Sequence, residues 1–206
     1  MRVIFLDIDG VLNTNDEARY HKLHEIEIAR GYGTFAESFC PMPEQTKRLL
    51  KMANTFPNTQ IVISSSWRNS GIPSHMWECL LYAAGGHNLP VRVNFEATNT
   101  LKLWEHRGLE IKQWLMDWDK LYREYQIRYN HEHILEDPIE SFVILDDDRD
   151  MEPFMDRLVG IDGDFGLTDG DVEKAIEILK RPMFDIEASF IYNPYVPEEL
   201  ITKGVV

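Results

Sequence analysis

The stretch "VIFLDIDGVLN", Val3 to Asn13, is the part of the chain from which the organisation of the rest can be inferred. Its first four residues are apolar, as expected for a strand that is covered on both faces of a parallel sheet. Two acids, Asp7 and Asp9, follow directly and are separated by one residue. Two carboxylates this close repel each other, and removing either from water is costly. A bound cation, or a division of catalytic work between the two acids, would justify the arrangement.

Other apolar runs of the sequence end in a similar way. Ile61–Ile63 is followed by three serines at 64–66, and Phe142–Leu145 is followed by three aspartates at 146–148. Val159–Ile161 is a further candidate strand. Helical periodicity covers residues 43–56, 74–86, 107–122 and 168–180, and the last of these begins with a capping signature, Thr168 with Asp171 three residues later. Strands that alternate with helices predict a three-layer α/β fold with a mostly parallel central sheet.

The polar residues that end these strands predict a functional site. In open parallel sheets, ligands bind outside the carboxyl ends of the strands, so the acids and hydroxyls should meet at one edge. A cluster of carboxylate oxygens, without paired cysteines or well-spaced histidines, suits Mg2+ better than Ca2+ or Zn2+. Phosphoryl transfer is the reaction class that such a site favours.

Composition and charge limit the class of protein. The chain has 206 residues, 44% of them hydrophobic, which favours one globular domain with insertions. Its apolar runs are too short to span a membrane, and we expect no signal peptide, so a cytoplasmic location is predicted. The net charge of −14 argues against a broad nucleic-acid-binding surface but allows a local basic pocket.

Three segments together resemble a known superfamily. "FLDIDGVLN", "IVISSSWR" and "FVILDDDRD" are similar to motifs one, two and four of the phosphohydrolase branch of the haloacid dehalogenase (HAD) superfamily. The resemblance covers roughly residues 2–180 in order and spacing, and it implies a Rossmann-like fold. It also implies that Asp7 is a nucleophile that forms an aspartyl-phosphate and that Asp9 is the general acid and base. Mg2+ would then be held by Asp7, the Asp9 backbone carbonyl and Asp146 or Asp147.

The resemblance leaves two positions of the predicted site open. In motif two, either Ser64 or Ser65 would contact a phosphate oxygen, with Ser65 the preferred residue. The superfamily also needs a basic residue near a helix start, for which Arg107 and Lys112 are candidates and Arg107 is preferred. Arg68, directly after motif two, is a further candidate for binding phosphate.

The sequence also predicts a domain organisation. Residues 1–180 would form the HAD-like domain, with 14–43 as a flap or small cap insertion and 181–206 as a C-terminal tail. Residues 85–104 are expected to form a second small lobe. Without a large cap, the site would be open to a bulky phosphate ester.

The substrate remains open at this point among a nucleotide, a nucleic-acid terminus and a phosphoprotein. The three motifs resemble the branch found with RNA-repair enzymes, which favours a polynucleotide end, whereas the net charge argues against it. A phosphotransferase using the same site and a non-catalytic binding protein of the same fold are the alternatives. A response-regulator receiver is disfavoured because only 58 residues follow Asp148.

Overall fold

The computed structural model describes residues 1–14, 42–66, 95–97, 107–129 and 138–183. Five strands form one parallel sheet in the order β3-β2-β1-β4-β5. The strands are β1 (Arg2–Leu6), β2 (Thr59–Ile63), β3 (Phe95–Ala97), β4 (Ser141–Asp146) and β5 (Leu158–Gly160). The predicted α/β fold with a mostly parallel sheet is confirmed.

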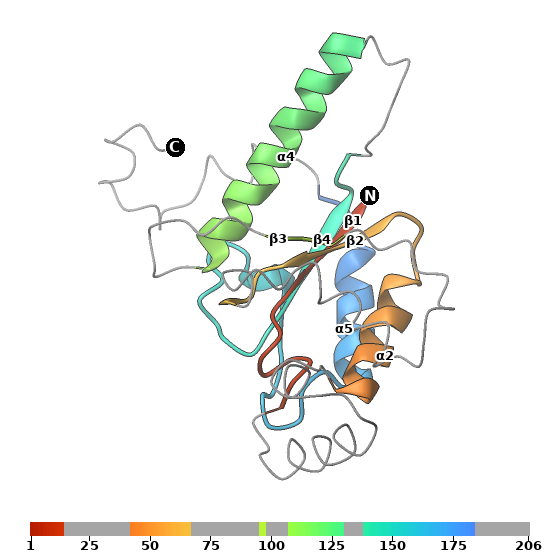
Figure 1. Ribbon diagram of the computed structural model, residues 1–206, viewed down its shortest axis with the longest axis vertical. Helices are drawn as coiled ribbons and strands as arrows, with labels where there is room; N and C mark the ends of the chain where they lie inside the picture. Colours follow the sequence, from red (N-terminus) through yellow and green to blue (C-terminus); the bar gives the residue numbers. More distant parts are fainter. Residues whose placement is uncertain (15–41, 67–94, 98–106, 130–137, 184–206) are drawn as a thin grey trace, which may run out of the picture.

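Helices cover both faces of the sheet (Figure 1). They are α2 (Pro43–Ala53), α4 (Arg107–Tyr129) and α5 (Asp169–Leu179), with a short 3-10 helix, η2, at Met155–Arg157. In Figure 1, α2 and α5 lie together on one side of the sheet and α4 lies on the other, which gives the three layers. The helix expected at 74–86 falls outside the described residues. None of the helices in the described ranges is long and apolar enough to cross a membrane.

Local sequence signals explain where α2 and α5 begin. Pro43 occupies the start of α2, where its missing N–H removes a donor that would have no intrahelical partner. At α5, the Thr168 side chain accepts a hydrogen bond from the Asp171 backbone N–H, and the Asp171 carboxylate accepts one from the Thr168 backbone. This reciprocal capping box, predicted from the sequence, fixes the first turn of α5.

Side chains of the central strands alternate between two hydrophobic cores. Ile4 and Leu6 of β1 pack in the core that α2 and α5 cover, whereas Val3 and Phe5 pack in the core beneath α4. β4 alternates in the same way, with Val143 and Leu145 toward α2 and α5, and Phe142 and Ile144 toward α4. Because side chains alternate along a strand, the residue that follows Leu6 or Leu145 is directed to the α4 side. Both of those residues are aspartates.

The edge strand β3 lies within residues 85–104, the segment for which a second lobe was expected. Phe95–Ala97 pairs in parallel with Ile61–Ile63 of β2 and so belongs to the sheet. Three residues are too few to produce a recognisable alternation, and pairing with β2 is a contact between distant parts of the chain. The rest of 85–104 lies outside the described residues, as do residues 15–41 of the expected flap and residues 184–206 of the expected tail.

Candidate active site

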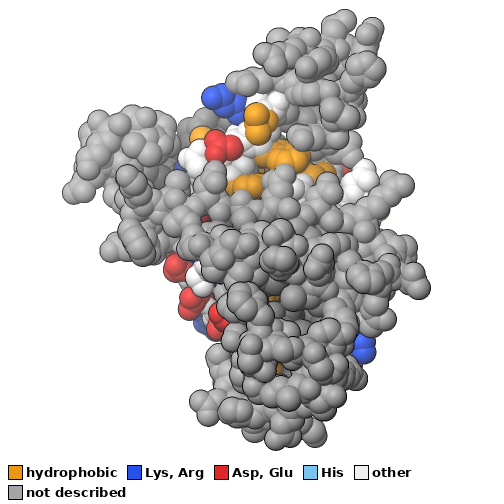
Figure 2. Space-filling view, viewed as in Figure 1, with side chains coloured by type: hydrophobic (Ala, Val, Ile, Leu, Met, Phe, Trp, Pro, Cys, Tyr) orange, Lys and Arg blue, Asp and Glu red, His pale blue; other side chains and the backbone are white. Residues whose placement is uncertain are grey.

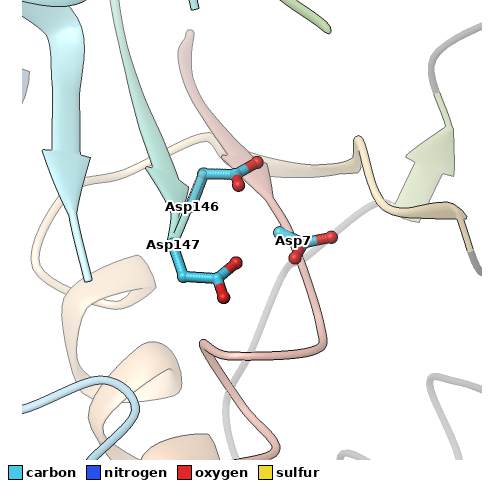
Figure 3. A group of neighbouring side chains, drawn as sticks. All are labelled: Asp7, Asp146 and Asp147. Atoms are coloured by element: carbon cyan, nitrogen blue, oxygen red, sulfur yellow. The ribbon is translucent and has the colours of Figure 1, made fainter. Parts of the chain in front are cut away.

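The register between β1 and β4 places two acids next to each other. Leu6 is opposite Leu145, and the Asp7 backbone N–H donates to the Leu145 carbonyl at 3.0 Å. Asp7 and Asp146 therefore end neighbouring strands at the same level, and both side chains are buried. Figure 3 shows these carboxylates with that of Asp147 at the ends of β1 and β4. The structure thus brings together acids that lie 139 residues apart in sequence.

The three carboxylates form a compact group of oxygen atoms. Asp7, Asp146 and Asp147 each offer one oxygen, and these three oxygens all lie within 4.8 Å of one another. Gly10 makes room for this arrangement: it has a φ of +73°, and a Cβ built there would lie 2.1 Å from Asp147 Oδ2. Only glycine can adopt that conformation and leave that space. The group contains no cysteine or histidine among the described residues, so its donors are those of a hard divalent cation such as Mg2+.

The first residue of α4 supplies a positive charge to this group. Arg107 Nη1 lies 2.5 Å from Asp146 Oδ2 and 3.3 Å from Asp7 Oδ1. Its other terminal nitrogen, Nη2, lies 4.0 Å from Asp148 Oδ2. Asp7 and Asp146 point toward the face of the sheet that α4 covers. The guanidinium of Arg107, at the start of α4, can therefore contact both carboxylates. Ion pairs of this kind reduce the cost of burying the carboxylates.

Burial is the main cause of the shifted pKa values of Asp7 and Asp146. It raises the pKa of Asp7 from 3.8 to about 6, although the nearby Arg107 and a hydrogen bond from Ser65 lower it. Burial likewise raises the pKa of Asp146 to about 7, and the charge of Asp7 adds to this rise. The pKa of Asp147 is also raised, again mainly by loss of solvent. Although burial alone lowers the pKa of Arg107, the charges of Asp146 and Asp7 raise it, so Arg107 stays protonated.

The alternatives that the sequence left open, Ser64 or Ser65 and Arg107 or Lys112, lie in different surroundings. Ser64 and Ser65 are both buried after β2, and the Ser64 N–H donates to the Leu6 carbonyl at 2.9 Å. The hydroxyl whose hydrogen bond lowers the pKa of Asp7 is that of Ser65. The guanidinium that contacts Asp7 and Asp146 belongs to Arg107. Lys112 is buried in the second turn of α4, where burial lowers its pKa.

Asp9 lies on the loop that follows β1. The loop turns back because the N–H groups of Val11, Leu12 and Asn13 all donate to the Ile8 carbonyl. Ile8 is fully buried in the core beneath α2 and α5, whereas Asp9 is exposed. The Asp9 carboxylate accepts a hydrogen bond from Asn13 Nδ2 at 3.3 Å. Of the predicted phosphate-binding residues, Arg68 falls outside the described residues.

Two residues close to this group were not predicted from the sequence. Asp150 Oδ2 accepts a hydrogen bond from the Arg107 backbone N–H at 3.3 Å. Gly108 leaves space for the segment after β4, since a Cβ there would lie 2.2 Å from the Glu152 carbonyl oxygen. Both residues can be seen in the sequence, Asp150 as an acid four residues after Asp146 and Gly108 as a glycine in the first turn of a predicted helix. Neither signal reveals that the two segments, more than 40 positions apart, are in contact.

A parallel sheet with helices on both faces is consistent with the Rossmann-like fold of the haloacid dehalogenase superfamily. More closely, the family described as "HAD domain in Swiss Army Knife RNA repair proteins" matches residues 3–172, and the chain belongs to it. The resemblance inferred from the three motifs is thereby confirmed. HAD domains are generally hydrolases, many of them phosphatases, and they typically use Mg2+. No curated protein and no solved structure matches the chain.

The raised pKa values predict how the stability of the metal-free protein depends on pH. The folded state holds protons on Asp7 and Asp146 more tightly than the unfolded chain does, so stability falls as the pH rises from about 4 to about 7. Asp7→Asn removes one negative charge and, with it, the repulsion that this charge exerts on Asp146. Arg107 keeps its ion pair with Asp146 in this variant. We expect the variant to exceed wild type by about 1–2 kcal/mol near pH 8, with the difference vanishing near pH 4.

Urea denaturation in the presence of a chelator measures this difference. Asp117→Asn, on the exposed face of α4 and about 15 Å along the helix from Arg107, is the control and should show no such pH dependence. A destabilised Asp7→Asn variant near pH 8 would show that ion pairing with Arg107 outweighs the burial of the Asp7 carboxylate.

Proposed function

We propose that the protein is a Mg2+-dependent phosphatase that hydrolyses a phosphomonoester through an aspartyl-phosphate on Asp7. The observation that carries this proposal is the contact of Arg107 with both Asp7 and Asp146 beside Asp147, at the carboxyl edge of the sheet. Membership of a HAD domain family supports the same reaction class.

In the first step, an oxygen of the Asp7 carboxylate would attack phosphorus while the bond from phosphorus to the ester oxygen breaks. Asp9 would give a proton to the departing oxygen, so the alcohol leaves neutral. The exposure of Asp9, and its hydrogen bond from Asn13, suit a carboxyl group that must meet a leaving group arriving from solvent. The two acids would thus share the step, with one as nucleophile and the other as acid.

In the second step, water would attack the phosphorus of the aspartyl-phosphate. Asp9, now a carboxylate, would take a proton from this water, the acyl phosphate bond would break, and Asp7 would be regenerated with release of inorganic phosphate. Arg107 and the Ser65 hydroxyl lie against the Asp7 carboxylate and would hold the phosphate oxygens as charge develops on them.

Asp7, Asp146 and Asp147, together with the Asp9 backbone carbonyl, would hold the metal. Their carboxylates outnumber the single guanidinium of Arg107, so a divalent cation would offset the remaining negative charge. When bound, Mg2+ neutralises phosphate oxygens and the charge of the nucleophile. The exclusively oxygen donor set of the described side chains fits this ion.

A test with p-nitrophenyl phosphate separates this mechanism from a non-catalytic role. Asp7→Asn should lose at least about a thousandfold in kcat because it removes the nucleophile. Asp9→Asn should lose about 100-fold, but mainly in the second step, because the nitrophenolate leaves without needing a proton. Rapid mixing should therefore show a burst of one nitrophenolate per Asp9→Asn molecule.

Asp117→Asn is the matched control and should turn over like wild type, since Asp117 is exposed on α4 away from the carboxylate group. Equal turnover by wild type and Asp7→Asn would remove the proposed mechanism. Faster release of nitrophenolate on addition of alcohols, with the phosphate recovered on the alcohol, would instead favour the phosphotransferase.

The proposed Mg2+ site is tested by a pair of glycine substitutions. Gly10→Ala places a methyl group where Asp147 Oδ2 lies, so it should weaken Mg2+ binding about tenfold or more. Gly160→Ala, at the end of β5, meets no atom within 4 Å and should leave binding unchanged. Calorimetric titration with Mg2+ and no substrate measures both, and equal affinities would argue against a site that contains Asp147.

For the substrate, we propose a phosphorylated polynucleotide end. The family description, which names RNA repair proteins, supports this class. Asp and Glu side chains gather on one flank of the molecule in Figure 2, and the chain as a whole is strongly acidic, so a polyanion would need a local positive charge. Arg149 offers one: it is exposed two residues after Asp147, and no described residue forms an ion pair with it.

A substrate comparison tests this choice. We expect kcat/KM to be higher for a 3′-phosphorylated oligonucleotide than for mononucleotides or sugar phosphates. Arg149→Ala should raise KM for the oligonucleotide about tenfold and leave p-nitrophenyl phosphate unaffected, since one phosphate contact is lost. Lys180→Ala is the control, because it removes a charge near the amino ends of the strands, away from the carboxylate group. Preference for a sugar phosphate would overturn the substrate class and leave the mechanism intact.

A further inference from the structure

We propose that Asp150 is a positioning residue, which holds the start of α4 so that Arg107 reaches both Asp7 and Asp146. This inference rests on the proposed function, because it concerns the same group of acids. It adds a residue with a different task, since Asp150 is not part of the three-carboxylate group formed by Asp7, Asp146 and Asp147.

The contacts of Asp150 are with the backbone at the beginning of α4. Its Oδ2 accepts from the Arg107 N–H at 3.3 Å, and its carbonyl oxygen accepts from the Gly108 N–H at 3.2 Å. The first N–H groups of a helix have no partner within the helix, and a carboxylate near them is also favoured by the helix dipole. Asp150 therefore acts as a cap from another part of the chain, and it ties α4 to the segment that follows β4.

Close packing keeps this connection short. A Cβ on Gly108 would lie 2.2 Å from the Glu152 carbonyl oxygen and 2.6 Å from the Met151 carbonyl carbon. The side chain of Met151 is itself fully buried beneath α4. The first turn of α4 therefore packs directly against the backbone of Met151 and Glu152. The hydrogen bonds that the Arg107 and Gly108 N–H groups donate to Asp150 fix its position there.

The position of α4 decides what the Arg107 side chain can reach. One nitrogen, Nη1, contacts both Asp146 and Asp7, so a small shift of the helix start would lengthen at least one of these ion pairs. Small displacements of groups that act on a reacting centre are costly in rate. Asp150 would therefore affect turnover without touching the substrate.

The second oxygen of Asp150 argues that stability alone does not account for this residue. Oδ1 is buried, and no described residue forms a hydrogen bond with it. A buried carboxylate oxygen in this situation is unfavourable, and such groups call for a functional explanation. The charge of Asp150 also contributes to keeping Arg107 protonated.

The test compares Asp150→Ala, Asp150→Ser and Asp150→Asn using p-nitrophenyl phosphate at saturating Mg2+. Asn keeps an acceptor at the same reach, so it should stay within about threefold of wild type, whereas Ala and the shorter Ser should lose about tenfold or more in kcat with little change in KM. Amide hydrogen exchange at Arg107 and Gly108 should be faster in the Ala and Ser variants and unchanged in Asn.

Thr168→Ala is the matched control, because it removes a side-chain cap from α5 and leaves the carboxylate group intact. It should keep the kcat of wild type even where its stability falls as far as that of Asp150→Ala. If Asp150→Ala does not fold, the comparison uses the kcat of Asp150→Ser relative to the kcat of Asp150→Asn.

Two results would overturn the inference. Unchanged kcat in the folded Ala or Ser variant would show that α4 keeps its place without Asp150. Weakened Mg2+ binding by calorimetry in both the Asn and Ser variants, with kcat restored at high Mg2+, would make Asp150 a metal ligand instead. An inactive wild type would refute the proposed function itself, whereas the exchange rates at Arg107 and Gly108 would still report on the cap.

Discussion

The ion pairs of Arg107 with Asp7 and Asp146 are the interactions on which the carboxyl edge of this protein depends. Two neighbouring strands end in buried aspartates, and the charge of Asp7 raises the free energy of ionising Asp146. One guanidinium between them offsets part of this repulsion, and the remaining negative charge is what makes the group attractive to a cation. The same charges that oppose folding are therefore the ones available for chemistry.

The fold delivers these residues through simple geometry. β1 and β4 are adjacent and in register, so Asp7 and Asp146 reach the edge at the same level. Alternation along each strand directs both toward α4, whose first residue is Arg107. No long loop is needed to assemble the group, since two strands and one helix place these three side chains. Elements packed in this way hold the three charged side chains in fixed positions.

Much of this architecture followed from local patterns in the sequence. Apolar runs gave β1, β2, β4 and β5 to within two residues at each end, and the Thr168–Asp171 pair gave the start of α5, because these signals involve residues close in sequence. β3 was missed because three residues carry no period, and its place depends on pairing with β2.

The candidate group of acids was also foreseeable in outline, because runs of acids after strands can be read directly. The contacts within it were not. Whether Ser64 or Ser65 bonds to Asp7, and whether Asp150 reaches the start of α4, depend on packing between segments far apart in the chain.

The two glycines at this edge have a consequence for how the region moves. Gly10 lies against the Asp147 side chain, and Gly108 lies against the backbone at Met151 and Glu152, with no room for even a methyl group at either place. The loop after β1, the segment after β4 and the first turn of α4 are thus interlocked, and none can swing outward alone. Local opening would have to release all three as one cooperative unit, so a disturbance at any of them would be felt at the carboxylates.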